Sequence, residues 1–128
     1  MGHIGFTPQF KTKFKIEGAS KKESLQLLKE AKDIEKAGAF SIVLECLTPS
    51  TAKLITSKLN IPTIGIGSSA YCDGQVLVTD DLIGLGKSKF RFVKKYANIN
   101  QIINSAVKKY KSEVLKKQFP RAKHSFKK

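Results

Sequence analysis

The stretch FSIVLECLTP, residues 40–49, decides the fold. Phe40, Ile42, Val43 and Leu44 form a short apolar stretch, rich in β-branched side chains and with almost no alternation, which is typical of a strand buried on both faces of a parallel sheet. Glu45 follows where such a strand leaves the core. Thr48 and Pro49 then stand in the order of a helix N-cap and a first helical residue. Since α/β proteins carry their chemistry at the carboxyl ends of parallel strands, Glu45 is the candidate catalytic residue.

The flanking segments alternate between helix and strand patterns. A capping box, Ser20 to Glu23, opens an amphipathic helix that ends at Gly38. The further expected elements are a helix over 48–60, buried strands over 63–67 and 75–79, and a basic amphipathic helix over 99–114 whose apolar stripe packs on the sheet. Residues 10–18 fit a loop or a short surface strand. This alternation indicates an α/β fold with a parallel sheet.

The charge is the unusual bulk property. The chain of 128 residues has a formal net charge of +14, which invites a nucleic-acid partner. Of its 24 basic residues, however, only Arg91 and Arg121 are arginine, the residue whose planar fork grips bases and phosphates. We therefore interpret the lysines as solvated helix faces and do not expect nucleic acid to be the partner.

Other features place the chain among cytoplasmic proteins. No apolar run approaches the ~20 residues of a membrane span, so we expect no membrane partner. The N-terminus has no secretory pattern of a basic region followed by an apolar one. Cys46 and Cys72 form no CxxC pattern and are interpreted as free thiols in a reducing compartment. The expected localisation is cytoplasmic.

Four motifs then appear in one order, and the tail stretch FPRAKHSF follows them at 119–126. They are MGHIGFTPQ at 1–9, AGAFSIVLEC at 37–46, IPTIGIG at 61–67 and CDGQVLVTDDLIGL at 72–85. Together they resemble the C-terminal half of the ketopantoate hydroxymethyltransferase (3-methyl-2-oxobutanoate hydroxymethyltransferase) family. One departure is GSS at 67–69, where the family more usually has GAG, which leaves the contacts of that loop open.

The resemblance implies the C-terminal half of a (β/α)₈ TIM-type barrel, a fold that takes ~250 residues when complete. Residues 1–128 are then a partial barrel domain that begins in the loop after the fifth strand and carries strands six to eight, with a basic C-terminal tail at 119–128. The gene would be split, truncated or mispredicted. Because a half-barrel exposes unpaired strand edges, we expect the chain alone to be unstable or to self-associate.

The resemblance also implies an activity: transfer of a hydroxymethyl group from 5,10-methylenetetrahydrofolate to 3-methyl-2-oxobutanoate, giving 2-dehydropantoate for pantothenate biosynthesis. Glu45 matches the family's proton acceptor. His3 matches a substrate-contacting histidine, although a lone histidine near a terminus is by itself more often an exposed side chain. Gly65 and Gly67 are either backbone-approach positions near the site or sites of tight packing.

Mg²⁺ is the implied cofactor, because a carboxylate is too weak a base to form the enolate without a Lewis acid. The family's metal ligands belong to the half that this chain lacks, so no metal ligand is expected here, and Asp80 and Asp81 receive a structural interpretation. The implied partners are the 2-oxo acid, the folate, the missing N-terminal half-barrel and further copies of the enzyme in a decamer.

Two other functions stay open. The first is an inactive remnant or a basic nucleic-acid-binding module that uses the half-barrel as a scaffold. The second is a related enolate-forming barrel enzyme that acts on another 2-oxo acid, since Glu45 and the barrel alone do not exclude it.

Overall fold

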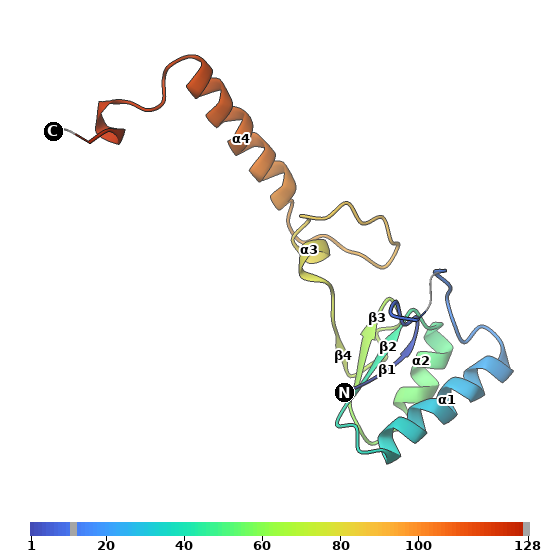
Figure 1. The fold of residues 1–128 in the computed structure, drawn as a ribbon. Helices are drawn as coiled ribbons and strands as arrows, with labels where there is room; N and C mark the ends of the chain where they lie inside the picture. Colours follow the sequence, from blue (N-terminus) through green and yellow to red (C-terminus); the bar gives the residue numbers. More distant parts are fainter. Residues whose placement is uncertain (11–12, 127–128) are drawn as a thin grey trace. The chain divides into compact units, whose positions relative to one another are not determined.

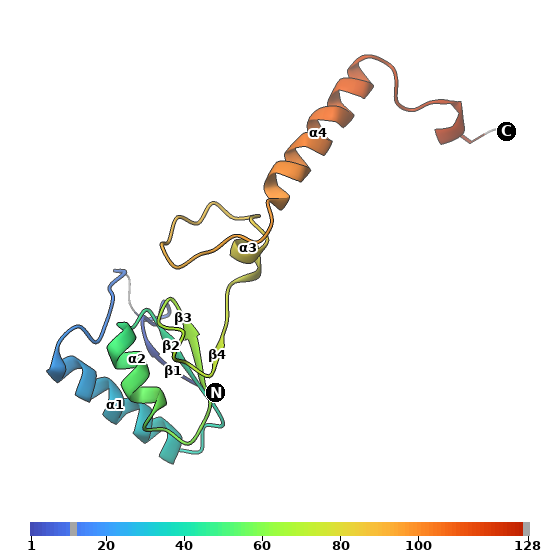
Figure 2. The same cartoon turned by 180° about the vertical axis from the view of Figure 1, so that it is seen from behind.

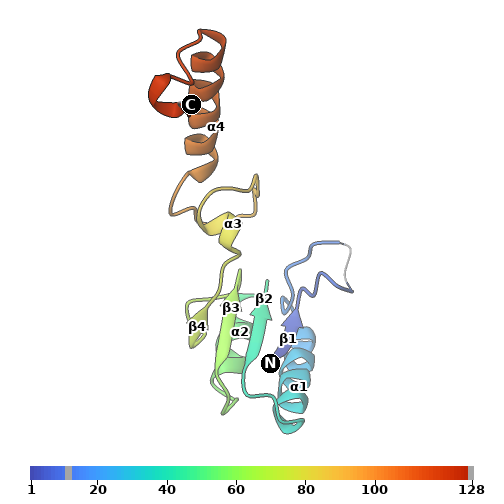
Figure 3. The ribbon, with the colours of Figure 1, turned by 60° about the vertical axis from the view of Figure 1, so that its left-hand side comes forward.

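Four short parallel strands form one sheet whose strand order follows the chain. The computed structural model describes residues 1–10 and 13–126 (Figure 1). The strands are β1 (Gly2–Gly5), β2 (Ile42–Glu45), β3 (Thr63–Ile66) and β4 (Gly74–Gln75), in the order β1-β2-β3-β4 (Figure 3). An order without reversal is that of a barrel wall, whereas a doubly wound sheet reverses at a switch point. The expected α/β fold with parallel strands is confirmed.

Two helices cover one face of this sheet. Helix α1 (Lys21–Lys36) and helix α2 (Pro49–Thr56) lie on the same side of the strands in Figures 1 and 2. Ser20 caps α1, since its hydroxyl oxygen accepts the Glu23 N–H at 3.1 Å, while the Glu23 carboxylate reaches back to the N–H of Ala19. Helix α2 ends earlier than the expected 48–60. Its Thr48 has extended N-cap dihedrals, but the hydroxyl bonds to the Gly18 carbonyl.

The burial of β2 alternates, which corrects the expectation of burial on both faces. Ile42 and Leu44 are fully buried and form a core with residues of α1 and α2, among them Leu27, Ala31, Ala52 and Ile55. Val43 and Glu45 point to the opposite face and are half-buried. Since α1 and α2 lie on the same side of the sheet (Figures 1 and 2), neither helix covers its second face, which we call the open face.

Three local expectations are wrong. The resemblance has the chain begin in the loop after a strand, but residues 2–5 form β1, because backbone groups of β2 supply hydrogen bonds to this glycine-rich stretch. The strand over 75–79 is reduced to β4, and α3 (Thr79–Leu82) begins within it. Phe40 is 73% exposed, so the buried run starts after it.

Residues 13–18 form a loop in which Glu17 makes a parallel bridge to Leu47. The expectation for residues 11 and 12, and for the last two residues of the tail, falls outside the described residues. No helix among the described residues is long and apolar enough to cross a membrane.

The chain divides into two compact units. The first comprises Met1–Leu77 with Phe90–Phe92, and the second comprises Val78–Lys89 with Val93–Lys128. The second unit contains α3, α4 (Ile99–Leu115) and a short 3₁₀ helix, η1 (Ala122–His124). The expected amphipathic helix is therefore present, but its apolar stripe is exposed: Ile102, Val107 and Tyr110 are between 58% and 62% exposed.

Candidate functional site

The two site residues expected from the sequence meet on the open face of the sheet. The register pairs His3 with Val43 and Gly5 with Glu45, which places the His3 and Glu45 side chains on the same face of neighbouring strands. His3 Nε2 lies 2.9 Å from Glu45 Oε2, and the two side chains are 27% and 15% exposed. Because a carboxylate only accepts hydrogen bonds, this contact requires a proton on Nε2. Glu45 is thus held near the carboxyl end of β2 and turned away from bulk solvent.

The backbone of Glu45 is held from both neighbouring strands. Its carbonyl oxygen accepts the N–H of Phe6 at 2.9 Å, and the next N–H, of Cys46, donates to Ile66 at 2.9 Å. Gly5 has a φ of +91°, and a Cβ at this position would overlap the Glu45 carbonyl oxygen. Only glycine permits this approach of β1 to the end of β2.

The chain turns sharply directly after Glu45. Cys46 has a φ of +55°, a left-handed conformation that is uncommon for a residue with a side chain. Its carbonyl accepts the N–H of Glu17 at 2.9 Å, and the Glu17 carbonyl accepts the N–H of Thr48 at 2.9 Å. The loop that joins β2 to α2 is therefore held in place by the segment that precedes α1.

Ser68 is a site-supporting residue that sequence reasoning missed. Its hydroxyl donates to the Leu44 carbonyl at 2.6 Å and accepts the Leu47 N–H at 3.1 Å. These two backbone groups flank Glu45 and Cys46, so one side chain from the β3 end closes the turn that carries the carboxylate. The available signal was the departure GSS at 67–69, but a contact across 21 to 24 residues is not visible in a local pattern.

The cysteines near this site are protonated thiols at neutral pH. Burial, followed by the negative charges of Glu45 and Glu17, raises the pKa of Cys46 to about 11. Burial also raises the pKa of Cys72. Both are free cysteines. A thiol that stays protonated is a poor nucleophile and a poor metal ligand, so neither side chain carries the chemistry of the site.

The described residues do not supply a magnesium site. Among residues 1–10 and 13–126, no group of three or more His, Cys, Asp or Glu side chains is placed to hold a metal ion. Asp80 and Asp81 lie in the first turn of α3, in the second unit. The carboxylate of Asp73 is used in the fold, since it accepts the backbone N–H of Thr63 at 2.8 Å and its hydroxyl at 2.9 Å.

The two glycines singled out in the TIGIG stretch are packed closely against this chain's own atoms. A Cβ on Gly65 would lie 2.9 Å from the Gln75 amide and 3.0 Å from the Cys72 sulfur. Gly67 has a φ of +61°, and a Cβ there would lie 2.8 Å from the ring of Phe92 and 3.3 Å from the Cys46 sulfur. Gly67 thus lets the β3 end pass between the turn after Glu45 and an aromatic ring.

Comparison with known proteins gives one consistent result. The family described as ketopantoate hydroxymethyltransferase matches residues 1–122. Proteins named 3-methyl-2-oxobutanoate hydroxymethyltransferase are similar to this chain: one from Pelagibacter ubique is 55% identical over 126 residues, one from Thermotoga maritima 49% over 130 and one from Clostridium beijerinckii 48% over 131. The matches cover 98–99% of this chain but 48–49% of each relative. The chain therefore spans about half the length of the curated relatives it matches.

Proposed function

The chain belongs to the ketopantoate hydroxymethyltransferase family, and from this membership we propose that it is the Glu45-bearing half of a 3-methyl-2-oxobutanoate hydroxymethyltransferase. The proposed reaction moves one carbon from 5,10-methylenetetrahydrofolate to C3 of 3-methyl-2-oxobutanoate. Water supplies the oxygen of the new hydroxyl group, and the products are 2-dehydropantoate and tetrahydrofolate. The role is a step of pantothenate biosynthesis.

The observation that carries the proposal is the contact between His3 Nε2 and Glu45 Oε2 at 2.9 Å. It holds one carboxylate oxygen, and no other hydrogen bond to the Glu45 side chain is present in the described chain. The second oxygen is the proton acceptor in our proposal. The C3–H bond of the 2-oxo acid breaks, the proton goes to Glu45, and the electron pair forms the C2–C3 double bond of the enolate. The enolate carbon then forms the bond to the one-carbon unit.

His3 has the role of a positioning and substrate-contacting residue. By donating from Nε2, it fixes the orientation of the carboxylate toward the open face of the sheet, where Val43 is only half-buried. The same imidazole is available to contact a bound 2-oxo acid. This agrees with the role that the family resemblance implies for His3.

The proposed enzyme uses Mg²⁺, but the side chains of this chain are not its ligands in our proposal. When bound, the ion would supply Lewis-acid stabilisation of the enolate. Since the described residues offer no cluster of metal ligands, we propose that the ligands come from the N-terminal half-barrel.

We also propose the N-terminal half-barrel as the partner that extends this sheet. Strand β1 pairs with β2 and strand β4 with β3, so β1 and β4 are the outermost strands of the described sheet. Ile64 and Ile66 lie half-buried on the open face, where the remaining strands of a barrel would cover them. We propose that the two halves together close a (β/α)₈ barrel, and that the closed enzyme assembles into a homo-oligomer, a decamer by family resemblance.

Reconstitution tests the proposal. The N-terminal half of the Pelagibacter ubique relative is co-expressed with this chain, and 2-dehydropantoate is measured with Mg²⁺ and 5,10-methylenetetrahydrofolate. Loss of the proton acceptor in Glu45→Gln should lower turnover by about 100-fold or more, with Mg²⁺ affinity unchanged. Glu30→Gln, an exposed change on α1, is the matched control. An inactive wild-type complex, or an active one in which Glu45→Gln retains full turnover, would refute the proposal.

A further inference from the structure

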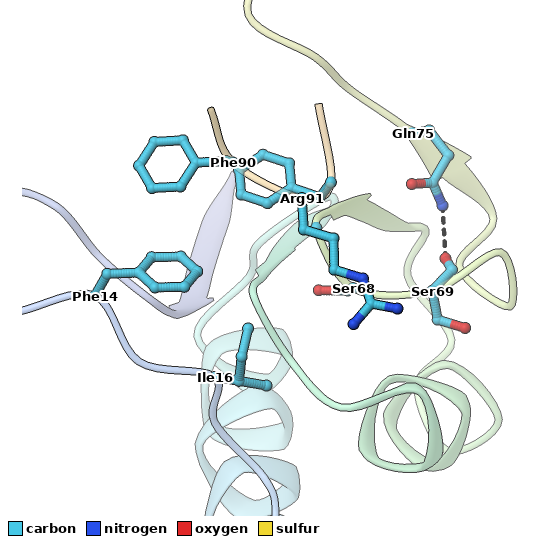
Figure 4. Close-up of a pocket in the computed structure, with 9 residues that line it drawn as sticks. Phe14, Ile16, Ser68, Ser69, Gln75, Phe90 and Arg91 are labelled. Carbon is cyan, nitrogen blue, oxygen red and sulfur yellow. Dashed lines mark hydrogen bonds between the residues drawn. The ribbon is translucent and has the colours of Figure 1, made fainter. Parts of the chain in front are cut away.

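The first unit contains a cavity that neither His3 nor Glu45 lines. Its volume is about 540 Å³, within the ~300–1,000 Å³ typical of small-molecule sites. The residues that line it are Phe14, Ile16, Gly67, Ser68, Ser69, Gln75, Phe90, Arg91 and Phe92. All of them belong to the first unit. The rings and polar groups of this pocket are separated to opposite sides (Figure 4).

Three phenyl rings form the apolar side of the pocket. The Phe90 and Phe92 rings are stacked, with centroids 5.4 Å apart and planes 10° from parallel, and the Phe14 ring lies 5.3 Å from that of Phe90. Phe14 and Phe90 are still 46% and 49% exposed, so this aromatic surface is available to a ligand. Such a wall favours a flat ring, which can add to the stack.

The opposite side carries groups that suit a polar ring with an anionic tail. Gln75 donates from Nε2 to the Ser69 carbonyl at 2.7 Å, which fixes its amide and leaves the carbonyl oxygen pointing toward the aromatic side (Figure 4). That oxygen can accept from a ring N–H. The Arg91 side chain extends between the two sides, and the described residues hold no hydrogen bond or ion pair to its guanidinium. An unpaired arginine in an aromatic pocket favours a carboxylate or phosphate.

This pocket is connected to the Glu45 turn through shared residues. Ser68 lines the pocket and bonds the backbone on both sides of Glu45 and Cys46. Gly67 also lines it and lies against both the Cys46 sulfur and the Phe92 ring. A ligand in the pocket would therefore lie beside the turn that holds the carboxylate.

We propose that this pocket binds a flat nitrogen heterocycle with a carboxylate tail, the ring stacked on Phe14 and Phe90 and the tail paired with Arg91. Of the two reactants in the proposed function, on which this choice of ligand rests, the 2-oxo acid has no ring and the folate donor has both features. The pocket is thus the binding site for the one-carbon donor, and Glu45 serves the other substrate.

Equilibrium dialysis of the full 128-residue chain against 5-formyltetrahydrofolate, an air-stable folate, tests the site. The absence of tryptophan leaves the ligand absorbance easy to follow. Arg91→Met should weaken binding about tenfold, as expected for the loss of a charge-assisted pair, while Arg121→Met, the matched change in the second unit, should not. Phe90→Leu should weaken binding, while Phe40→Leu, also an exposed phenylalanine, should leave it unchanged.

A second ligand separates the contribution of the ring contact from that of the carboxylate contact. For 6-methylpterin, which has no carboxylate, Phe90→Leu should weaken binding and Arg91→Met should have no effect. The same dialysis is repeated on the complex with the N-terminal half. The inference would be overturned if neither the chain alone nor the complex bound the folate saturably. It would also be overturned if all four variants bound the folate with the same affinity as the unchanged chain. Because the proposed function is measured by product formation, an active complex with equal variants refutes this pocket alone, and an inactive complex with the expected pattern refutes the function alone.

Discussion

Replacing Gly5 by alanine should destabilise the chain more than the same replacement at Gly38, although the two glycines have nearly the same φ, +91° and +90°. At Gly38 a Cβ would meet nothing within 4 Å. The cost there is the conformational one alone, about 1–2 kcal/mol for placing an L-residue at positive φ. At Gly5 the Cβ would also overlap the Glu45 carbonyl oxygen and lie 2.9 Å from Leu47 Cδ2.

The overlap at Gly5 adds an overpacking term. A backbone carbonyl cannot rotate away as a side chain can, so β1 or the end of β2 must move, at a further cost of about 1–3 kcal/mol. With a urea m-value of about 2 kcal/mol/M, the unfolding midpoint of Gly5→Ala should fall about 0.5–1.5 M below that of Gly38→Ala.

Urea titrations followed by far-UV circular dichroism measure this difference directly. Histidine NMR gives a second readout, because the chain has only two histidines, His3 and His124. Gly5→Ala should move the His3 signals, since the strand that carries His3 shifts against Glu45, and should leave those of His124 unchanged. Equal urea midpoints for the two variants, with unmoved His3 signals, would refute the close approach of β1 to Glu45.

Three further results are expected. Ser68→Ala should lower the free energy of unfolding by about 1–3 kcal/mol, because the Leu47 N–H and the Leu44 carbonyl lose their partner. The loss should be larger than for Ser57→Ala, whose hydroxyl donates to one exposed carbonyl. Equal losses in the two variants would contradict the role of Ser68 in closing the turn. Hydrogen bonds from the Thr63 N–H and hydroxyl lower the pKa of Asp73, so its stabilising effect is complete above the unfolded pKa and is lost as the pH falls below about 4. Urea midpoints against pH should show this acid limb, and Asp73→Asn should flatten it. The Cys46 thiol, with its pKa raised to about 11, should resist iodoacetamide at pH 8 until urea unfolds the chain. Mass spectrometry measures the labelling rate, and equal rates in the folded and the urea-unfolded chain would contradict the burial of Cys46.

The boundaries of α1 and the position of Glu45 at a strand end were accessible from the sequence. Ser20, Glu23 and Gly38 mark α1 correctly, because caps and positive φ depend on contacts within a few residues. Glu45 was placed at a strand end by its position after an apolar run, and β2 does end there. His3 was indicated only by family resemblance, since no local pattern predicts a contact with a residue 42 positions away.

The errors share one cause. The stretch from Gly2 to Gly5 has little strand propensity, and it is a strand because β2 offers it a free row of backbone groups. The apolar run of β2 looked buried on both faces, yet the helices cover only the Ile42 and Leu44 side. Which face of a strand is covered depends on elements far away in the chain, and composition does not report it.

By itself, the sequence determined the order of six elements, the caps of α1, and the family to which the chain belongs; the six elements are α1, β2, α2, β3, β4 and α4. Only the tertiary structure decided that Ser68 closes the turn after Glu45, that Gly5 must be a glycine because of a carbonyl oxygen on another strand, and that Arg91 lines one pocket with three phenylalanines. The physical reason is that caps and turns are settled by neighbouring residues, whereas these contacts join main-chain and side-chain atoms that only the pairing of parallel strands brings together.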